Sequence, residues 1–246
     1  MNIIISPAKK MNICNDDIVH KTLPHFMEET NKLHNSLKNL NYDDLKALLC
    51  CNDDIATLNY ERYKSMDLAS NLTPAILAYE GIQYKYMSPS SFTFDDFDYV
   101  EKHLKILSGF YGILTPFDGV VPYRLEMQAK HKIEEHKNLY TFWGDKLYKE
   151  LTKDSNVILN LASKEYSKAI EKYLKPEDTF ITCVFGSLKN SKIKVKATEA
   201  KMARGLMVRF LAKNSIDNIE DIKRFSELGF SYSDEYSTRS EFIFLK

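Results

Sequence analysis

Residues 107–127 read LSGFYGILTPFDGVVPYRLEM and interrupt a chain that is otherwise rich in regular patterns. The stretch contains three glycines, two prolines and four aromatic residues, and its charged side chains all lie in its second half. Proline removes a backbone donor and glycine weakens the interior of helices and strands, so no single element can span it. It predicts turns between extended segments and a short strand that displays Arg124, which either pairs with Asp118 or Glu126 or faces a ligand.

Before this stretch, the apolar periodicity predicts one short buried strand followed by helices. The strand covers residues 2–6 and ends at Pro7, and helices are expected at 22–40, 42–50, 53–66, 73–81 and 93–107. Gly109 follows the last of these helices, at the position of a C-terminal cap.

After the stretch, strands and helices alternate more evenly. We expect a helix at 141–153, a buried strand at 156–163 that leads into a helix capped by Ser163, a hairpin of strands at 179–186 and 192–197, helices at 198–213 and 219–225, and a last strand at 241–245. The pattern predicts a mixed α/β fold: a single domain spanning residues 1–246, with a central mixed sheet and helices concentrated in the N-terminal half.

The composition argues against a uniformly basic protein, a secreted protein and a membrane-spanning protein. The 246 residues include 34 Lys and Arg and 34 Asp and Glu, so the formal net charge is zero and any site for a polyanion must be local. The N-terminus MNIIISPAKK turns basic after a few apolar residues, unlike a signal peptide. No run approaches the roughly 20 apolar residues of a membrane span. We therefore expect a cytoplasmic protein with no membrane partner.

The cysteines and histidines give no sign of a metal site. His131 and His136 are five residues apart, which is poor spacing for two ligands on one helix face, and no metal or nucleotide signature occurs. Cys50 and Cys51 are expected to be core thiols in a reducing compartment. We predict no metal and no cofactor. The four cysteines are Cys14, Cys50, Cys51 and Cys183.

The segment SPAK, which follows the first strand, has the Ser-x-x-Lys spacing of penicillin-recognising enzymes. Pro7 lies inside the motif and the partner motifs are missing, so a solvated pair of lysines is the simpler interpretation. A third interpretation is that the strand end carries Lys9 and Lys10 into a cleft, where they bind phosphate.

The helix at 198–213 is basic on one side. At 100° per residue its core face carries Ala203, Leu206, Met207 and Phe210, and the opposite face carries Lys201, Arg204, Gly205 and Arg209. Glycine inside a helix costs about 1 kcal/mol relative to alanine, so Gly205 needs a reason. Either a phosphate approaches the helix there, or the glycine packs against another element.

Polar residues follow the buried strand at 156–163. Ligand sites of open α/β sheets gather beyond the carboxyl ends of strands, which makes this segment a candidate site. Helix capping by Ser163 is the alternative, but it leaves Asn160 unexplained. The residues concerned are Asn160, Ser163, Lys164, Glu165 and Tyr166.

Together, several motifs resemble those of the YaaA peroxide stress proteins, in order and approximate spacing across nearly the whole chain. They are ISPAK, LSGFYGIL with PFD and PYRLEM, FWGD, NLASKEY and KMARGLMVRF. The chain departs from the family at Met202, where members often have a second basic residue, and before Thr73. The resemblance implies a basic cleft, DNA binding with a helix-hairpin-helix element, and a role in limiting peroxide damage. The turn from Gly109 to Gly112 is the candidate for that element, although it is one residue longer than the usual turn.

These observations give two hypotheses. The first is a DNA-binding protein without catalytic residues that contacts the backbone with little sequence specificity, as a monomer. Its contacts are Lys9, Lys10, Arg124, Lys164, Lys201, Arg204, Gly205 and Arg209. The second is an enzyme acting on a nucleobase or nucleotide, with a pocket formed by Ser6, Tyr123, Asn160, Ser163, Glu165 and Tyr166. An open basic groove favours the first, and a deep pocket around Glu165 favours the second. An iron-binding protein, a third interpretation, lacks ligand spacing.

Overall fold

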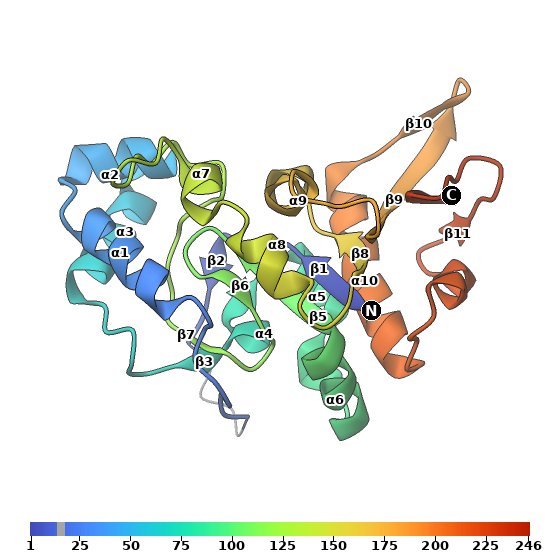
Figure 1. Cartoon of the computed structure of the whole chain (residues 1–246), viewed down its shortest axis with the longest axis horizontal. Helices are drawn as coiled ribbons and strands as arrows, with labels where there is room; N and C mark the ends of the chain where they lie inside the picture. The colour runs from blue at the N-terminus through green and yellow to red at the C-terminus, as the bar shows by residue number, and fades with distance from the viewer. Residues whose placement is uncertain (14–17) are drawn as a thin grey trace.

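The computed structural model describes residues 1–13 and 18–246, so Cys14 lies outside the described residues. Its main feature is one mixed sheet, as the alternating pattern predicts (Figure 1). The strands run in the order β11-β12-β9-β8-β1-β5-β6. Their bounds are β1 Asn2–Ile5, β5 Leu104–Ser108, β6 Gly112–Leu114, β8 Val157–Leu161, β9 Thr179–Lys189, β11 Ser231–Tyr232 and β12 Glu241–Leu245.

The five central strands, from β12 to β5, are parallel, and the edge strands β11 and β6 are antiparallel to their neighbours. Parallel strands are covered on both faces and read as continuous apolar runs, which is the pattern of β1: Ile3, Ile4 and Ile5 are all fully buried. From β1 the chain reaches β5 on one side and β8 on the other. This reversal of strand order places a topological switch point beside the carboxyl end of β1.

Three helices of the first half, α1, α2 and α3, lie beside the sheet (Figure 1), whereas α6 packs on β1 and β5. Figure 1 shows α1, α2 and α3 together at one end of the molecule, opposite the end formed by β9 and β10. The helices of the first half are α1 Met27–Lys38, α2 Tyr42–Leu49, α3 Asp53–Ser65, α4 Ala75–Ala78, α5 Ile82–Met87 and α6 Phe94–His103. The predicted helices at 42–50 and 53–66 are confirmed, each started by an asparagine side chain, Asn41 or Asn52, that accepts from a backbone amide.

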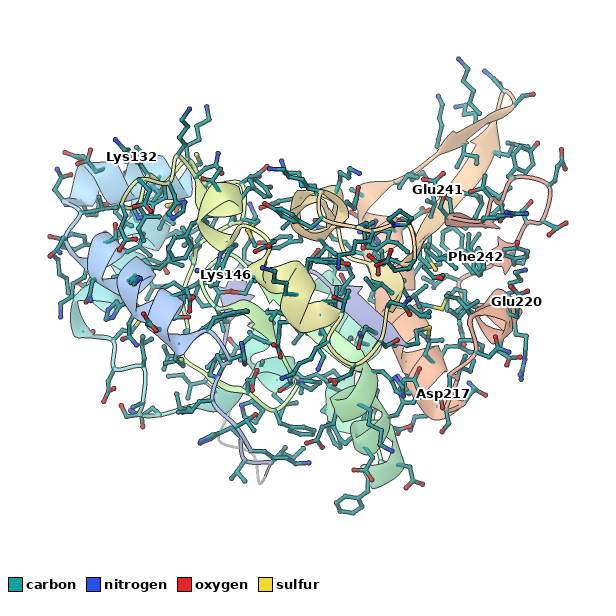
Figure 2. The ribbon with its side chains drawn as sticks, viewed as in Figure 1. Lys132, Lys146, Asp217, Glu220, Glu241 and Phe242 are labelled. Atoms are coloured by element: carbon teal, nitrogen blue, oxygen red, sulfur yellow. The ribbon has the colours of Figure 1, made fainter. Side chains whose placement is uncertain are left out.

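The second half has four α-helices among the described residues: α7 Leu139–Trp143, α8 Lys146–Leu151, α9 Lys164–Glu171 and α10 Ala197–Lys213. Helix α10 packs on α5, α6 and β9, and α8 packs on α9 and β6. Lys146, labelled in Figure 2, joins α8 to α1 through a 2.9 Å ion pair with Glu29. The predicted short helix near Ile219 is the 3₁₀ segment Ile219–Arg224.

Four predicted helices differ from the structure. The helix expected at 22–40 begins only at Met27, and Thr22 instead forms a bridge with Asp118. The helix expected at 93–107 ends at His103, and Leu104–Ser108 forms β5, because pairing with β1 overrides the helical pattern. The helix expected at 73–81 is broken into β3 Thr73–Pro74, α4 and β4 Tyr79–Glu80, and Gly81 precedes α5 instead of ending a helix. The helix expected at 141–153 is divided into α7 and α8 at Gly144, whose φ is +53°.

Strand β9 extends beyond the sheet. Its last residues leave β8 and β12 and pair with β10 Lys192–Lys194 in an antiparallel ribbon. Asn190 and Ser191 both have positive φ, as a two-residue turn of the type common in hairpins requires. The predicted hairpin is confirmed, and it projects from the body of the molecule (Figure 1). None of the helices in the described part of the chain is long and apolar enough to cross a membrane.

Candidate functional site

The candidate site lies where β1 and β8 end side by side. Ser6 follows β1, and Ser163 follows β8 and precedes α9. The backbone amide of Ser163 donates to Ser6 Oγ at 2.8 Å, and the Ser6 hydroxyl lies 3.2 Å from that of Ser163. Beyond these strand ends is a cavity of about 320 Å³. Its place matches the switch point at which open α/β sheets bind ligands.

Most of the predicted site residues line this cavity. They come from the segment after β1, the loop after β7 (Gly119–Val120), the start of α9 and the first turns of α10. The lining residues that the sequence predicts are Ser6, Lys9, Lys10, Tyr123, Arg124, Ser163, Glu165, Tyr166, Lys201 and Arg204.

The cationic side chains of the cavity are not equally free. Lys9 pairs with Glu126 at 2.8 Å, and Arg124 reaches the same carboxylate oxygen at 3.3 Å. Arg204 and Lys201 make no ion pair with any residue that the structure describes. Burial lowers the pKa of the Arg204 guanidinium from its ordinary value, yet arginine remains protonated at neutral pH. Arg204 therefore carries an uncompensated positive charge into the cavity.

Because Lys9 pairs with Glu126, its ammonium group is not available to activate Ser6 as in the Ser-x-x-Lys enzymes. The Ser6 hydroxyl instead holds the turn after β8 through the Ser163 amide. The Ser163 side chain makes no capping bond to its own helix, although Ser163 does occupy the N-cap position of α9. The two serines thus connect the segment after β1 to the turn after β8, and both residues line the cavity.

The stretch at 107–127 positions Tyr123 and Arg124. Ser108 Oγ accepts the amides of Phe110 and Tyr111 and lies 2.6 Å from the Tyr123 hydroxyl. The backbone of Arg124 is held by the buried Tyr63, whose hydroxyl donates to the Arg124 carbonyl at 2.7 Å. No strand forms at 121–127, so the predicted display strand is wrong, and Arg124 lies in a loop instead.

The turn at 109–112 joins β5 to β6 in an antiparallel hairpin of the sheet, so assigning a helix-hairpin-helix element to it is wrong. Close packing explains why both ends of this turn are glycines. A Cβ at Gly109 would lie 2.6 Å from the Leu125 carbonyl oxygen, and one at Gly112, whose φ is +78°, would meet the Trp143 ring at 2.8 Å. The Trp143 indole donates to the Gly109 carbonyl at 3.0 Å.

The glycine of the basic helix also has a packing reason. A Cβ at Gly205 would lie 2.1 Å from the Gln83 carbonyl oxygen and 2.9 Å from the Met87 amide, so α5 crosses α10 at backbone contact. Of the two explanations that the sequence leaves open, the structure supplies the second. The face around Gly205, which lies opposite the expected core face, is covered by α5, and Arg204 is partly buried.

Glu165 is the titratable group whose environment is suited to proton transfer. Burial raises the pKa of its carboxyl above the ordinary 4.5, the backbone amide of Gln128 lowers it, and the charge of Glu126 raises it further. Oε1 of Glu165 accepts that amide at 3.2 Å. A half-buried carboxyl with a raised pKa at the edge of a cavity is able to give or take a proton.

Comparison with known proteins identifies the relatives of this chain. The sequence pattern of the peroxide stress protein YaaA matches residues 1–236. The chain belongs to the YaaA family of peroxide stress proteins. It is 56% identical to a UPF0246 protein of Desulfitobacterium hafniense over 246 residues, which is 100% of this chain and 98% of that protein. It is 52% identical to a UPF0246 protein of Ligilactobacillus salivarius, with both chains covered fully.

Four residues proposed from the motifs shared with the YaaA family lie apart from the cavity lining. Asn160 is buried, where its side chain accepts the Ala162 amide at 2.9 Å and so shapes the turn after β8. Lys164 pairs with Glu171 on its own helix. Arg209 is further along α10, and Gly205 packs on α5. None of the four contributes to the cavity wall.

The cavity also has walls that the motifs do not point to. The segment 80–84 contributes Gln83 from α5 and Tyr84, whose hydroxyl donates to the Ser6 carbonyl at 3.0 Å. Glu80 pairs with Lys10 at 2.7 Å. No motif in the sequence marks segment 80–84 as part of a site. Residues of this segment reach the cavity because α5 packs on α10 at Gly205.

In the described part of the chain, one group of three side chains could converge on a metal: Glu134, Glu135 and His136 on the surface. His131 does not belong to this group; it is buried, and its Nε2 atom is hydrogen-bonded to the Ser36 hydroxyl at 2.9 Å. The expectation of two core thiols is wrong for Cys50, which is exposed at the end of α2.

Proposed function

We propose that this member of the YaaA family binds DNA through phosphate contacts at the carboxyl edge of its sheet, and that this binding limits peroxide damage. The observation that carries the proposal is that Arg204 makes no ion pair within the described residues and shares the cavity with the exposed Lys201, which makes none there either. A guanidinium that is partly buried and has no carboxylate partner is costly, and a phosphate oxygen supplies the missing partner. Nonspecific DNA binding is mainly such phosphate neutralisation.

The hairpin of β9 and β10 supports the proposal independently. Lys189 lies directly opposite Lys192 across the ribbon, and Lys194 follows; all three are exposed and make no ion pair within the described residues. Like charges opposite one another repel, and a polyanion removes that cost. A two-stranded ribbon also fits the major groove of DNA.

The hairpin and the cavity lie at the same edge of the sheet. Strands β1, β8 and β9 are parallel, so the residues after β1, the start of α9 and the end of β9 all emerge in one direction. Lys196, at the N-cap of α10, connects the ribbon to the helix that carries Lys201 and Arg204. A duplex that reaches the cavity can therefore contact the ribbon as well.

The test is a titration of a fluorescent duplex at several salt concentrations. We expect the logarithm of the association constant to fall linearly with the logarithm of the salt concentration, and to vary little with sequence. Arg204→Gln should weaken all duplexes about equally and reduce the slope by about one. The matched control is Lys132→Gln, since Lys132 lies at the end of the molecule remote from the hairpin (Figure 2). A flat salt dependence removes the proposal.

A second candidate function is an enzyme acting on a nucleobase or nucleotide, and a specific observation favours it. Glu165, whose carboxyl has a raised pKa, lines the cavity together with Tyr123 and Tyr166. Such a wall suits a planar base, and such a carboxyl suits proton transfer. Incubation with nucleosides and nucleotides, followed by chromatography, tests it. We expect turnover to be lost in Glu165→Gln; no turnover in the wild type would exclude this candidate.

A further inference from the structure

Three buried hydrogen-bond donors of one cavity have no partner among the described residues. They are the Nε2 atom of Gln83 and the Nε atoms of Arg124 and Arg204. Within the described residues, only one other buried side-chain atom, on Asn59, shares this condition. A buried donor without an acceptor costs about 1–3 kcal/mol, and native structures contain few of them. In the folded protein such donors bind either water in the cavity or a ligand, and their concentration in one cavity makes it a candidate site for a ligand that supplies acceptors.

The positions of these donors are fixed by packing. Gly205 allows the backbone of Gln83 to touch α10, which places Gln83 beside Arg204. The Tyr63 hydroxyl donates to the backbone carbonyl of Arg124, and the Arg124 guanidinium donates to a Glu126 carboxylate oxygen at 3.3 Å. Gln83 itself is only 7% exposed. The site is therefore organised before any ligand arrives, which lowers the entropic cost of binding.

The chemistry of the donors limits the ligand. Two guanidinium groups and one amide nitrogen offer donors only, and Arg204 has no carboxylate partner among the described residues. A ligand must be negatively charged and present several oxygens within a small volume. A carboxylate has two oxygens, and an internal phosphodiester of DNA has two terminal oxygens and one charge. A phosphate monoester has three terminal oxygens and carries nearly two charges at neutral pH.

We propose that Gln83, Arg124 and Arg204 form a binding site for a phosphate monoester. The cavity of about 320 Å³ has room for more than the phosphate, and the rings of Tyr84 and Tyr123 form part of its wall. The organic part of the ligand is therefore a nucleoside, either in a free 5′-mononucleotide or at a 5′-phosphorylated end of DNA. This site goes beyond contacts along a DNA backbone, and it stands even if internal duplex binding fails.

Isothermal titration calorimetry with inorganic phosphate and with a 5′-mononucleotide tests the site. We expect both to bind the wild-type protein, the nucleotide more tightly. Gln83→Glu has the same shape but replaces the donor by a carboxylate that repels phosphate, so it should weaken both ligands at least about tenfold. Arg204→Lys, which keeps the charge but loses the planar guanidinium, should weaken them by a similar factor. Lys132→Gln should have no effect. Circular dichroism melts establish that each variant is folded.

The source of the monoester is distinguished with two duplexes that differ only in a 5′-phosphate or a 5′-hydroxyl. Tighter binding of the phosphorylated duplex, abolished by Gln83→Glu, identifies a DNA end. Equal binding of both duplexes, together with binding of the mononucleotide, identifies a free nucleotide. Failure of phosphate, mononucleotide and phosphorylated duplex to bind overturns the site, as does unchanged affinity in folded Gln83→Glu and Arg204→Lys. Duplex binding without any monoester preference, combined with no binding of phosphate or of the mononucleotide, overturns this site while leaving backbone binding intact.

Discussion

The backbone amide of Ser163 donates a 2.8 Å hydrogen bond to the hydroxyl oxygen of Ser6. The two residues are 157 positions apart in sequence, and each follows the carboxyl end of a central parallel strand. The bond joins β1 to the turn that begins α9, directly below the cavity that holds Arg124 and Arg204. One serine side chain therefore links the two segments that form the floor of the site.

Replacing Ser6 by alanine tests this link. The Ser163 amide loses its acceptor in a partly buried position, so we expect a loss of about 1 kcal/mol in the free energy of unfolding, measured by urea denaturation. The exposed Ser90→Ala is the control and should change stability by less than about 0.5 kcal/mol. If Ser6→Ala is as stable as the control, the bond is not holding the strand ends together.

Gly205→Ala should destabilise the protein although alanine is the better helix former. The gain in helix propensity is about 1 kcal/mol, whereas the new Cβ would lie 2.1 Å from the Gln83 carbonyl oxygen. Moving α5 away costs about 1–3 kcal/mol or more in lost packing. A net loss of unfolding free energy, with the exposed Lys201→Ala of the same helix unchanged, is the expected result. A stabilised Gly205→Ala protein would contradict the contact between α5 and α10.

Glu165 should make stability depend on pH in a defined direction. Because burial raises its pKa above 4.5, ionisation is less favourable in the folded protein than in the unfolded chain. Its contribution to stability is thus fully present below pH 4.5 and is lost as the pH rises through the folded pKa. Glu165→Gln keeps an acceptor for the Gln128 amide but cannot ionise.

We therefore expect Glu165→Gln to be more stable than the wild type at pH 7.5 and to lose this advantage near pH 4, in urea denaturation at both pH values. The exposed Glu235→Gln serves as the control and should follow the wild type throughout. An advantage that is the same at both pH values would show that burial of the charge is not its origin.

The lysines of the hairpin should affect DNA binding without affecting the fold. Changing Lys189, Lys192 and Lys194 to glutamine removes the repulsion across the ribbon, so thermal stability should be unchanged or slightly higher. Duplex affinity should fall, and the salt slope should decrease by as much as about 0.9 for each lost phosphate contact. A triple change at Lys32, Lys38 and Lys132, far from the hairpin, controls for the loss of net charge. Equal effects of the two triple variants would place the DNA elsewhere.

We expect purified protein to carry no stoichiometric iron or zinc. The one converging group in the described part of the chain, Glu134, Glu135 and His136, is exposed and provides two carboxylates and one imidazole, a weak set for selecting either metal. Elemental analysis after dialysis measures the content. About one metal ion per chain, lost in His136→Ala, would contradict this and require a metal role for the segment.

Much of the local structure follows from local pattern. The apolar run in β1, the run in β8 ahead of Ser163, and the alternation of lysine with Ile193 and Val195 all predict the elements that form. Asparagine caps begin the helices α2 and α3 where the sequence places them. These predictions hold because periodicity, capping and turn chemistry act between residues a few positions apart.

Predictions failed where distant segments compete with local preference. Leu104–Ser108 continues a helical pattern but becomes β5, because pairing with β1 buries it within the sheet. The face of α10 around Gly205 is polar in a helical wheel but is covered by α5. A helical wheel identifies the faces of a helix, but it does not say which neighbour will cover them.

The sequence by itself determined the α/β class, most of the elements, the family, and several residues of the candidate site: Ser6, Arg124, Glu165 and Arg204. The tertiary structure alone decided that these residues share one cavity, that Asn160, Lys164 and Arg209 do not, and that Gln83 does. The physical reason is that a ligand site requires side chains from distant segments to converge. That convergence depends on strand order and on the backbone contact at Gly205, and neither is encoded by spacing along the chain.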